Sequence, residues 1–184
     1  MGLFAECGYA AATNADIAEA AVLTRGAMLY HFPTREDLAA AAVVHIQAAR
    51  IALFEAAGGR SDYANTADHA IDTYWTLLHE VPFRAFRALE AAAHSDGRLR
   101  ALLAPAIEAF DRAQMGVVTP ALVQAGSSPR LQASRDLARF ALEGLALAKL
   151  TFDGEARTER LIAVIKRATH MLNRRGAGQD IWED

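Results

Sequence analysis

The chain has 184 residues, of which 53% are hydrophobic, and its formal net charge is −3 at pH 7. A chain of this length can bury a hydrophobic core without disulfides or metals. The single cysteine, Cys7, excludes an internal disulfide and is expected to be a small buried residue. The negative net charge argues against a protein that coats nucleic acid by bulk charge, so any contact with DNA has to be local.

The pattern of apolar residues predicts an all-α protein. Alanine, the best helix former, supplies much of the hydrophobic content, and apolar residues recur at helical spacing between glycines and prolines without strand signals. No uncharged apolar stretch reaches the roughly 18 residues of a membrane span, and no basic residue precedes an apolar run near Met1. A soluble, cytoplasmic protein without a membrane partner is therefore expected.

The segment from Thr13 to Leu38 carries the signals of two short helices and a turn. Thr13 can cap a helix in a capping box with Asp16, and this helix is expected to end near Ala21. Thr24 caps the next helix, which Pro33 stops because proline has no N–H to continue the ladder. Ile17, Ala21, Leu23 and Met28 are expected to form the small core between the two helices, and Ala18 is small enough to let the helices approach closely. This layout predicts a helix-turn-helix that presents its second helix to a DNA major groove.

The same segment closely resembles the signature of the tetracycline-repressor (TetR) family of transcriptional regulators. The matching runs are Ile17-Ala18-Glu19-Ala20-Ala21, Thr24-Arg25-Gly26-Ala27 and Tyr30-His31-Phe32-Pro33-Thr34-Arg35-Glu36, and the local match covers Leu3 to Leu38. The resemblance implies an N-terminal helix-turn-helix domain followed by a helical ligand-binding and dimerisation domain. We place these at residues 1–45 and 46–176, with a flexible tail at 177–184.

Three positions depart from the family pattern. Family members usually carry more of the first helix and a basic arm before the position of Leu3, so a truncated first helix is expected. The turn commonly has glycine where this chain has Val22, so this turn must differ or be strained. The aromatic often found at the position of Leu29 is absent, although Tyr30 follows it.

Hydroxyl and guanidinium groups at successive helix N-termini suit contacts with phosphates and bases. Taken singly, these residues could be ordinary caps and solvated charges, but within this motif a DNA-binding role is favoured. The first fifty residues nevertheless hold more acidic than basic side chains. The predicted DNA-binding residues are Thr13, Thr24, Arg25, Gly26, Ala27, Leu29, Tyr30, His31, Thr34 and Arg35.

A long helix is predicted from Thr34 for about 24 residues to near Gly58, followed by an amphipathic helix over 62–80. Further on, Pro105 and Pro120 are expected to kink or divide a helix. Aromatic and thioether groups with a few polar side chains in this middle part suit an apolar ligand cavity, although most could be plain core. The candidates are Tyr74, Trp75, His79, Phe83, Phe86, Arg87, Phe110, Asp111 and Met115.

The last two predicted helices carry apolar stripes with small residues. Ser128 and Pro129 mark the start of the first of them. The stripes could close the internal core alone, but the resemblance implies that they pair with a second subunit as a four-helix bundle. The predicted interface contains Leu137, Phe140, Ala141, Gly144, Leu145, Ala148, Leu161, Ile165, Ala168 and Leu172.

No phosphate loop, activated nucleophile or metal-ligand spacing stands out, so we expect no enzyme activity, no cofactor and no metal. The favoured hypothesis is a homodimeric repressor that a small apolar or amphipathic effector releases from a palindromic operator. The alternative is a helical sensor or interaction module with a degenerate helix-turn-helix.

Overall fold

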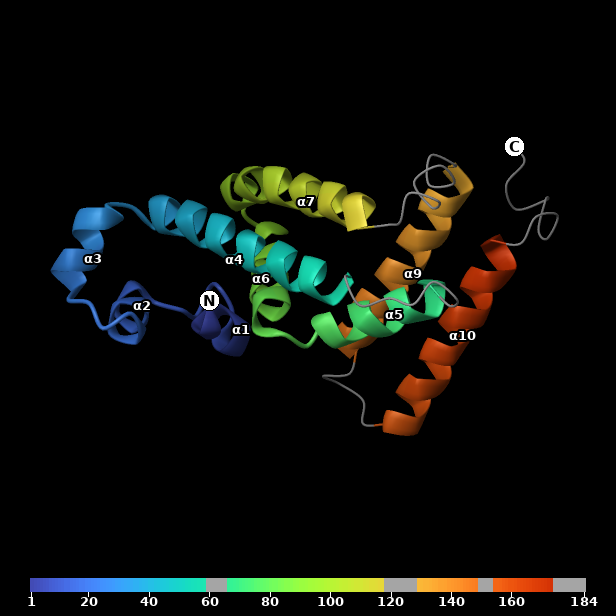
Figure 1. Ribbon diagram of the computed structural model, residues 1–184. Helices are drawn as coiled ribbons and strands as arrows, with labels where there is room; N and C mark the ends of the chain where they lie inside the picture. Colours follow the sequence, from blue (N-terminus) through green and yellow to red (C-terminus); the bar gives the residue numbers. More distant parts are fainter. Residues whose placement is uncertain (59–65, 118–128, 149–153, 174–184) are drawn as a thin grey trace. The chain divides into compact units, whose positions relative to one another are not determined.

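A computed structural model describes residues 1–58, 66–117, 129–148 and 154–173, and within these ranges it contains helices and no strand. The all-α prediction is confirmed. The helices in chain order are α1 (Gly2–Cys7), α2 (Asn14–Ala20), α3 (Arg25–His31), α4 (Arg35–Gly58), α5 (Thr66–Leu77), α6 (Val81–Ala93), α7 (Gly97–Val117), α9 (Pro129–Ala148) and α10 (Glu155–Asn173) (Figure 1).

The helices form two compact units. The first comprises Met1–Glu55 and His79–Gln114, and the second comprises Ala56–Leu78 and Met115–Asp184. The first unit thus joins the predicted DNA-binding region to α6 and most of α7. The predicted tail, 177–184, lies outside the described residues.

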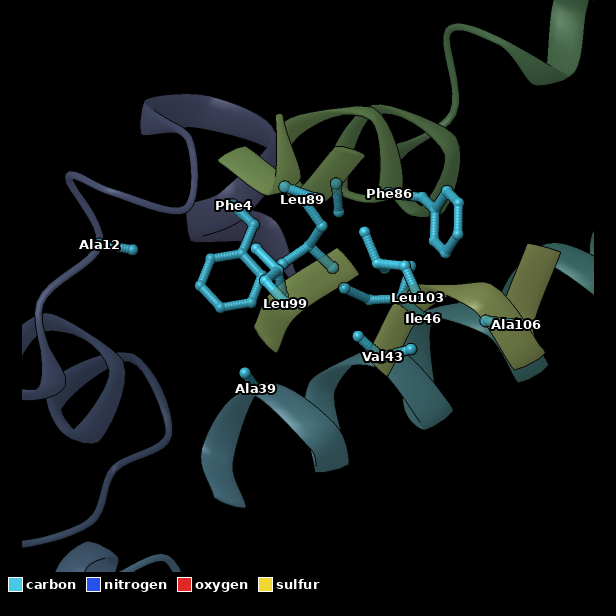
Figure 2. Packing of buried hydrophobic residues seen from close by; sticks show 12 residues of the cluster. Phe4, Ala12, Ala39, Val43, Ile46, Phe86, Leu89, Leu99, Leu103 and Ala106 are labelled. Atoms are coloured by element: carbon cyan, nitrogen blue, oxygen red, sulfur yellow. The ribbon is translucent and has the colours of Figure 1, made fainter. Parts of the chain in front are cut away.

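The core of the first unit brings α1, α4, α6 and α7 together. Phe4 of α1 packs with the apolar faces of the other three helices, and Figure 2 shows these side chains directed toward one another. Arg84 of α6 also donates to the carbonyl oxygen of Ala5 at 2.9 Å. The first helix is therefore held on α6 as well as on its neighbours in sequence. The buried members are Phe4, Ala12, Ala39, Val43, Ile46, Ala85, Phe86, Leu89, Ala93, Leu99, Leu103 and Ala106.

In the second unit, α5, α9 and α10 pack against one another. Their buried residues include Ile71 and Tyr74 of α5 and Leu142 of α9. An ion pair and a hydrogen bond join α5 to α10: Lys166 Nζ lies 2.6 Å from Asp72 Oδ2, and His170 Nε2 lies 2.8 Å from Asp68 Oδ1.

Helix boundaries agree well with the sequence pattern. α4 runs for 24 residues to Gly58, as predicted, and α9 begins at Pro129, while Ser128 lies outside the described residues. α7 continues through Pro105 from Gly97 to Val117, so Pro105 does not divide this helix. Pro120 lies outside the described residues.

One helix, α4, is long and apolar enough between Arg35 and Ala57 to cross a membrane by length and composition alone. The core helix of a soluble protein passes the same test. Val43 and Ile46 of α4 lie in the core of the first unit, and the buried Arg50 is on the same helix. The membrane evidence is accordingly weak.

Three single-residue expectations are wrong. Cys7 is exposed rather than buried, and its thiol donates to the carbonyl oxygen of Leu3 at 3.1 Å. Ala21 is exposed and Leu23 is 44% exposed, so neither belongs to the helix-turn-helix core. These residues lie at a helix end and in a turn, where helical periodicity no longer determines which side chains face inward.

Candidate functional site

The helices of the helix-turn-helix begin at the predicted threonine caps. Thr13 Oγ1 accepts from the backbone N–H of Asp16 at 3.2 Å, and Asp16 Oδ2 accepts from the backbone N–H of Thr13 at 3.0 Å, which completes a capping box. Hydrogen bonds from the side chain and backbone of Thr13 lower the pKa of the Asp16 carboxyl from its usual value of 3.8. Thr24 Oγ1 accepts from the N–H of Ala27 at 3.1 Å and starts α3. Each cap satisfies a backbone donor that a helix leaves open.

The turn between α2 and α3 is a Schellman motif with valine at its left-handed position. The N–H of Leu23 donates to the carbonyl oxygen of Ala18 at 2.9 Å, and the N–H of Val22 donates to that of Glu19 at 3.0 Å. This pattern places the residue after the helix cap at positive φ, where glycine is usual. Val22 has φ 56°. The turn therefore keeps the usual hydrogen bonds, and Val22 carries backbone strain.

A small separate core fixes α2 and α3 to the start of α4. Ala18, Met28 and Leu38 are buried together, with Ile17 and Phe32 packed against them. Met28 is 2% exposed, so α3 turns this residue inward and its other faces outward. The prediction that Ile17 and Met28 belong to this core is confirmed, and Ala18 is buried with Met28.

The outward face of α3 holds the central DNA-binding candidates. Arg25, Gly26, Leu29 and Tyr30 follow one another at positions i, i+1, i+4 and i+5, and all four are exposed. Tyr30 is 84% exposed, which is unusual for a large aromatic side chain. A Cβ added to Gly26 would meet only Thr24 Oγ1, at 4.0 Å. Packing within the chain therefore does not require glycine at this position.

The remaining DNA-binding candidates lie at the ends of these helices. Thr13, Thr24, His31 and Thr34 are exposed, and Ala27 is half-buried. Thr34 caps α4 through a hydrogen bond from the N–H of Asp37 to Thr34 Oγ1 at 3.1 Å. These hydroxyls already serve as helix caps, and their contacts with phosphate remain predictions.

Arg35 has a structural position that the sequence did not reveal. Its Nη2 donates to the carbonyl oxygen of Tyr9 at 2.6 Å, and its Nη1 donates to that of Ala12 at 3.0 Å and to Asn14 Oδ1 at 3.3 Å. Its Cζ lies 4.6 Å from the centroid of the Tyr9 ring. Arg35 thus ties the start of α4 to the loop between α1 and α2, whereas its predicted phosphate contact remains untested.

The predicted ligand-binding residues are divided between the two units. In the first, Phe83, Phe86 and Phe110 are buried, Arg87 and Asp111 are half-buried, and His79 is exposed. In the second, Tyr74 is buried and Trp75 is half-buried, and Tyr74 donates its hydroxyl to Glu143 Oε1 at 2.6 Å. The side chain of Met115 lies outside the described residues.

Sequence reasoning overlooked Arg50, which lies beside the rings of Phe83, Phe86 and Phe110, and its hydrogen-bond partner Gln47. Arg50 Nη1 donates to Gln47 Oε1 at 3.1 Å, and both residues are buried. A signal was available, because Val43, Ile46 and Arg50 are spaced to share the inward face of α4. Polar residues on an apolar stripe are candidates for function, since burial of a charge is otherwise unfavourable.

The predicted dimer interface coincides with an exposed apolar face on α9. Leu137 and Phe140 are each 58% exposed and Leu147 is 63% exposed, and Ala141 and Gly144 complete the stripe. On α10, Leu161, Val164 and Met171 are exposed, and Ile165, Ala168 and Leu172 are half-buried. Leu145 is 8% exposed and packs inside the second unit, and Ala148 is half-buried.

Within the part of the chain that the structure describes, no group of three or more potential metal ligands is found. The fold and the capped, outward-facing α3 define the class of protein: an all-α protein with an N-terminal helix-turn-helix of the DNA-binding type.

Comparison with known proteins identifies this region further. Residues 1–42 match the family model of the bacterial regulatory proteins of the tetR family. Among solved structures, a crystal structure from Rhodococcus sp. assigned to the TetR-family transcriptional regulators matches with a TM-score of 0.66 and 22% sequence identity over 93% of each chain. At this identity the likeness shows a shared fold. A search of curated proteins found no match.

The resemblance seen in the sequence is thus confirmed. Residues 1–42 are thus a DNA-binding domain of the tetR type, and the chain shares the all-α fold of the matched structure.

Proposed function

We propose that this protein is a ligand-responsive repressor that a small apolar or amphipathic effector releases from a palindromic operator. The observation that carries the DNA-binding part is the α3 face of Arg25, Gly26, Leu29 and Tyr30, which is exposed although one member is a large aromatic residue. A surface of this kind suits base edges and phosphates, and the open space at Gly26 suits close approach of a DNA backbone.

The proposed active form is a homodimer in the cytoplasm. The stripe of Leu137, Phe140, Ala141, Gly144 and Leu147 supports it, because a contiguous exposed apolar face on a helix marks an interaction surface. A twofold dimer would hold two α3 helices about one DNA turn, roughly 34 Å, apart for the two halves of a palindrome.

Packing of α4 offers a route for release by an effector. Leu38 of α4 packs with Met28 of α3, and Val43 and Ile46 of the same helix pack with α6 and α7. The helix spans about 36 Å at 1.5 Å per residue. A ligand that moves α6 or α7 against α4 would therefore tilt the start of α4, on which α3 packs. The coupling free energy between two such sites is typically about 1 to 3 kcal/mol.

Gly26→Ala tests the DNA-binding part. The added methyl group meets nothing closer than 4.0 Å within the chain, so the melting temperature should hold or rise, because alanine favours helix. Affinity for DNA upstream of the protein's own gene should fall at least about tenfold if the backbone approaches DNA here. Gly97→Ala, at another open position on α7, is the matched control and should leave DNA affinity unchanged.

A helical sensor with a degenerate helix-turn-helix remains the second candidate, and the strained Val22 favours it. Under that function the wild type and both glycine variants would bind upstream DNA no more tightly than random DNA.

A further inference from the structure

Helix α3 offers few polar side chains to the edges of DNA bases. The structure describes α3 in full, and its sequence contains one arginine but no lysine, asparagine, glutamine or acidic residue. The absent residue types are those that, with arginine, make the usual hydrogen-bonded contacts to guanine, adenine and cytosine in the major groove. Arg25, the first residue of α3, is therefore the one side chain of this helix that can bind guanine in a bidentate manner.

The second turn of α3 instead carries two exposed residues with large apolar surfaces. Leu29 is 38% exposed and Tyr30 is 84% exposed, whereas Met28, just before them, is 2% exposed and belongs to the small core. The ring of Tyr30 meets the ring of His31 edge to face, with the centroids 5.4 Å apart. Packing within the described part of the chain thus leaves much of both side chains open to a partner.

Gly26 lies one helical turn before these two residues and on the same side of α3. Leu29 follows it by three positions and Tyr30 by four, so the three positions are neighbours on the helix surface. Because Gly26 has no side chain, the backbone can approach DNA closely there and bring Leu29 and Tyr30 toward the base edges. The C5 methyl of thymine is the one methyl group that the four bases present in the major groove.

We infer that Leu29 and Tyr30 recognise thymine through its C5 methyl group, and that each operator half-site carries thymine under the second turn of α3. The inference rests on the proposed function, since it names a base that the regulator reads. It assigns specificity to apolar contact at these two positions, beside any phosphate or guanine contact of Arg25. Burial of one methyl group corresponds to about a fourfold change in affinity.

Replacement of single thymines by deoxyuridine tests the inference, because deoxyuridine lacks the methyl group and keeps the hydrogen-bonding groups of thymine. The full chain is titrated with duplexes of the DNA upstream of its own gene, each carrying one replacement. At least one thymine in each half-site should show a loss of affinity of about fourfold or more, and thymines outside the bound site should show none. This loss should disappear in Leu29→Ala or in Tyr30→Ala.

Ile107→Ala is the matched control. Ile107 lies on α7 and is 37% exposed, against 38% for Leu29, so its replacement removes a similar apolar surface away from α3. This variant should keep the loss of affinity on deoxyuridine. Tyr30 is 84% exposed, so Tyr30→Ala removes little packing and keeps the test valid even if Leu29→Ala lowers the stability of the protein.

Equal affinity for thymine and deoxyuridine at every position of a bound site would overturn the inference and leave the proposed function intact. A loss that persists unchanged in both Leu29→Ala and Tyr30→Ala would also overturn it, because the methyl group would then act through the shape of the DNA. Failure of the proposed function gives a different result: the wild type would bind every upstream duplex no more tightly than random DNA, which overturns both.

Discussion

At the scale of single residues, Val22 is a valine in a left-handed backbone conformation that usually belongs to glycine. The Schellman turn holds it at φ 56°, and its side chain is 92% exposed, so no packing compensates for the strain. A left-handed conformation costs a non-glycine residue about 1 to 2 kcal/mol. The sequence alone predicted a strained or altered turn, and the structure shows that the strained turn is the one adopted.

Val22→Gly should therefore stabilise the protein by about 1 kcal/mol, after the greater freedom of glycine in the unfolded chain is subtracted. Thermal unfolding followed by circular dichroism measures the change. The matched control is Val44→Gly, a valine inside α4 that is 70% exposed, which should lower stability because glycine disfavours a helix interior. A lower melting temperature for Val22→Gly would contradict the assignment of strain.

Asp16 is the second residue-scale prediction, and it concerns pH. Its pKa is lowered in the folded protein by hydrogen bonds from Thr13, so its stabilising contribution is present above 3.8 and is lost as the pH falls through the lowered pKa. Thr13→Ala should return the pKa of Asp16 toward 3.8, which NMR titration of the carboxyl carbon can follow. An unchanged pKa in Thr13→Ala would show that the capping box is not its cause.

At the scale of elements, local signals account for the accuracy of the predicted helix-turn-helix. Thr13, Thr24 and Thr34 cap through neighbours three residues away, and Pro33 ends a helix through its own chemistry, so short stretches of sequence suffice. Arg35 is different, because its partners Tyr9 and Ala12 lie more than 20 residues earlier. The helical spacing of residues in the sequence does not predict such a long-range contact.

Replacement of Arg35 and replacement of Arg25 by alanine should therefore have different effects on the stability of the protein. Arg35→Ala removes charge-assisted hydrogen bonds from the loop between α1 and α2, and should lower both the melting temperature and DNA affinity, with a stability loss of about 2 kcal/mol. Arg25→Ala, on the exposed face of α3, should lower DNA affinity and its salt dependence without loss of stability. Equal melting temperatures for Arg35→Ala and the wild type would contradict the structural role of Arg35.

At the scale of the whole molecule, the sequence anticipated which helices exist but not how they group. The predicted boundary at residue 45 follows the motif, whereas the compact first unit also takes in α6 and most of α7, because Phe4 and Arg84 bring α1 onto α6. The buried position of Arg50 likewise depends on rings from two later helices. Contacts of this kind are set by tertiary packing, which local sequence does not encode directly.

The proposed dimer belongs to this scale as well. Gly144→Phe should leave the fold of the single chain intact, because a Cβ there meets nothing within 4 Å, yet it should separate two α9 helices and shift the protein toward monomer in analytical ultracentrifugation. Gln132→Phe, exposed on α9 outside the apolar stripe, is the control and should remain dimeric. A wild-type monomer at micromolar concentration would contradict the proposed interface.

Hydroxyl-radical footprinting of the DNA upstream of the protein's own gene tests the central claim most directly. A dimeric regulator that inserts α3 into successive major grooves should protect a palindrome whose half-site centres are separated by one DNA turn or a multiple of it, about 10 to 10.5 base pairs per turn. Gly26→Ala should remove this protection, and Gly97→Ala should retain it. Uniform cleavage at micromolar wild-type protein, or protection that Gly26→Ala leaves unchanged, would contradict a DNA-binding role for α3.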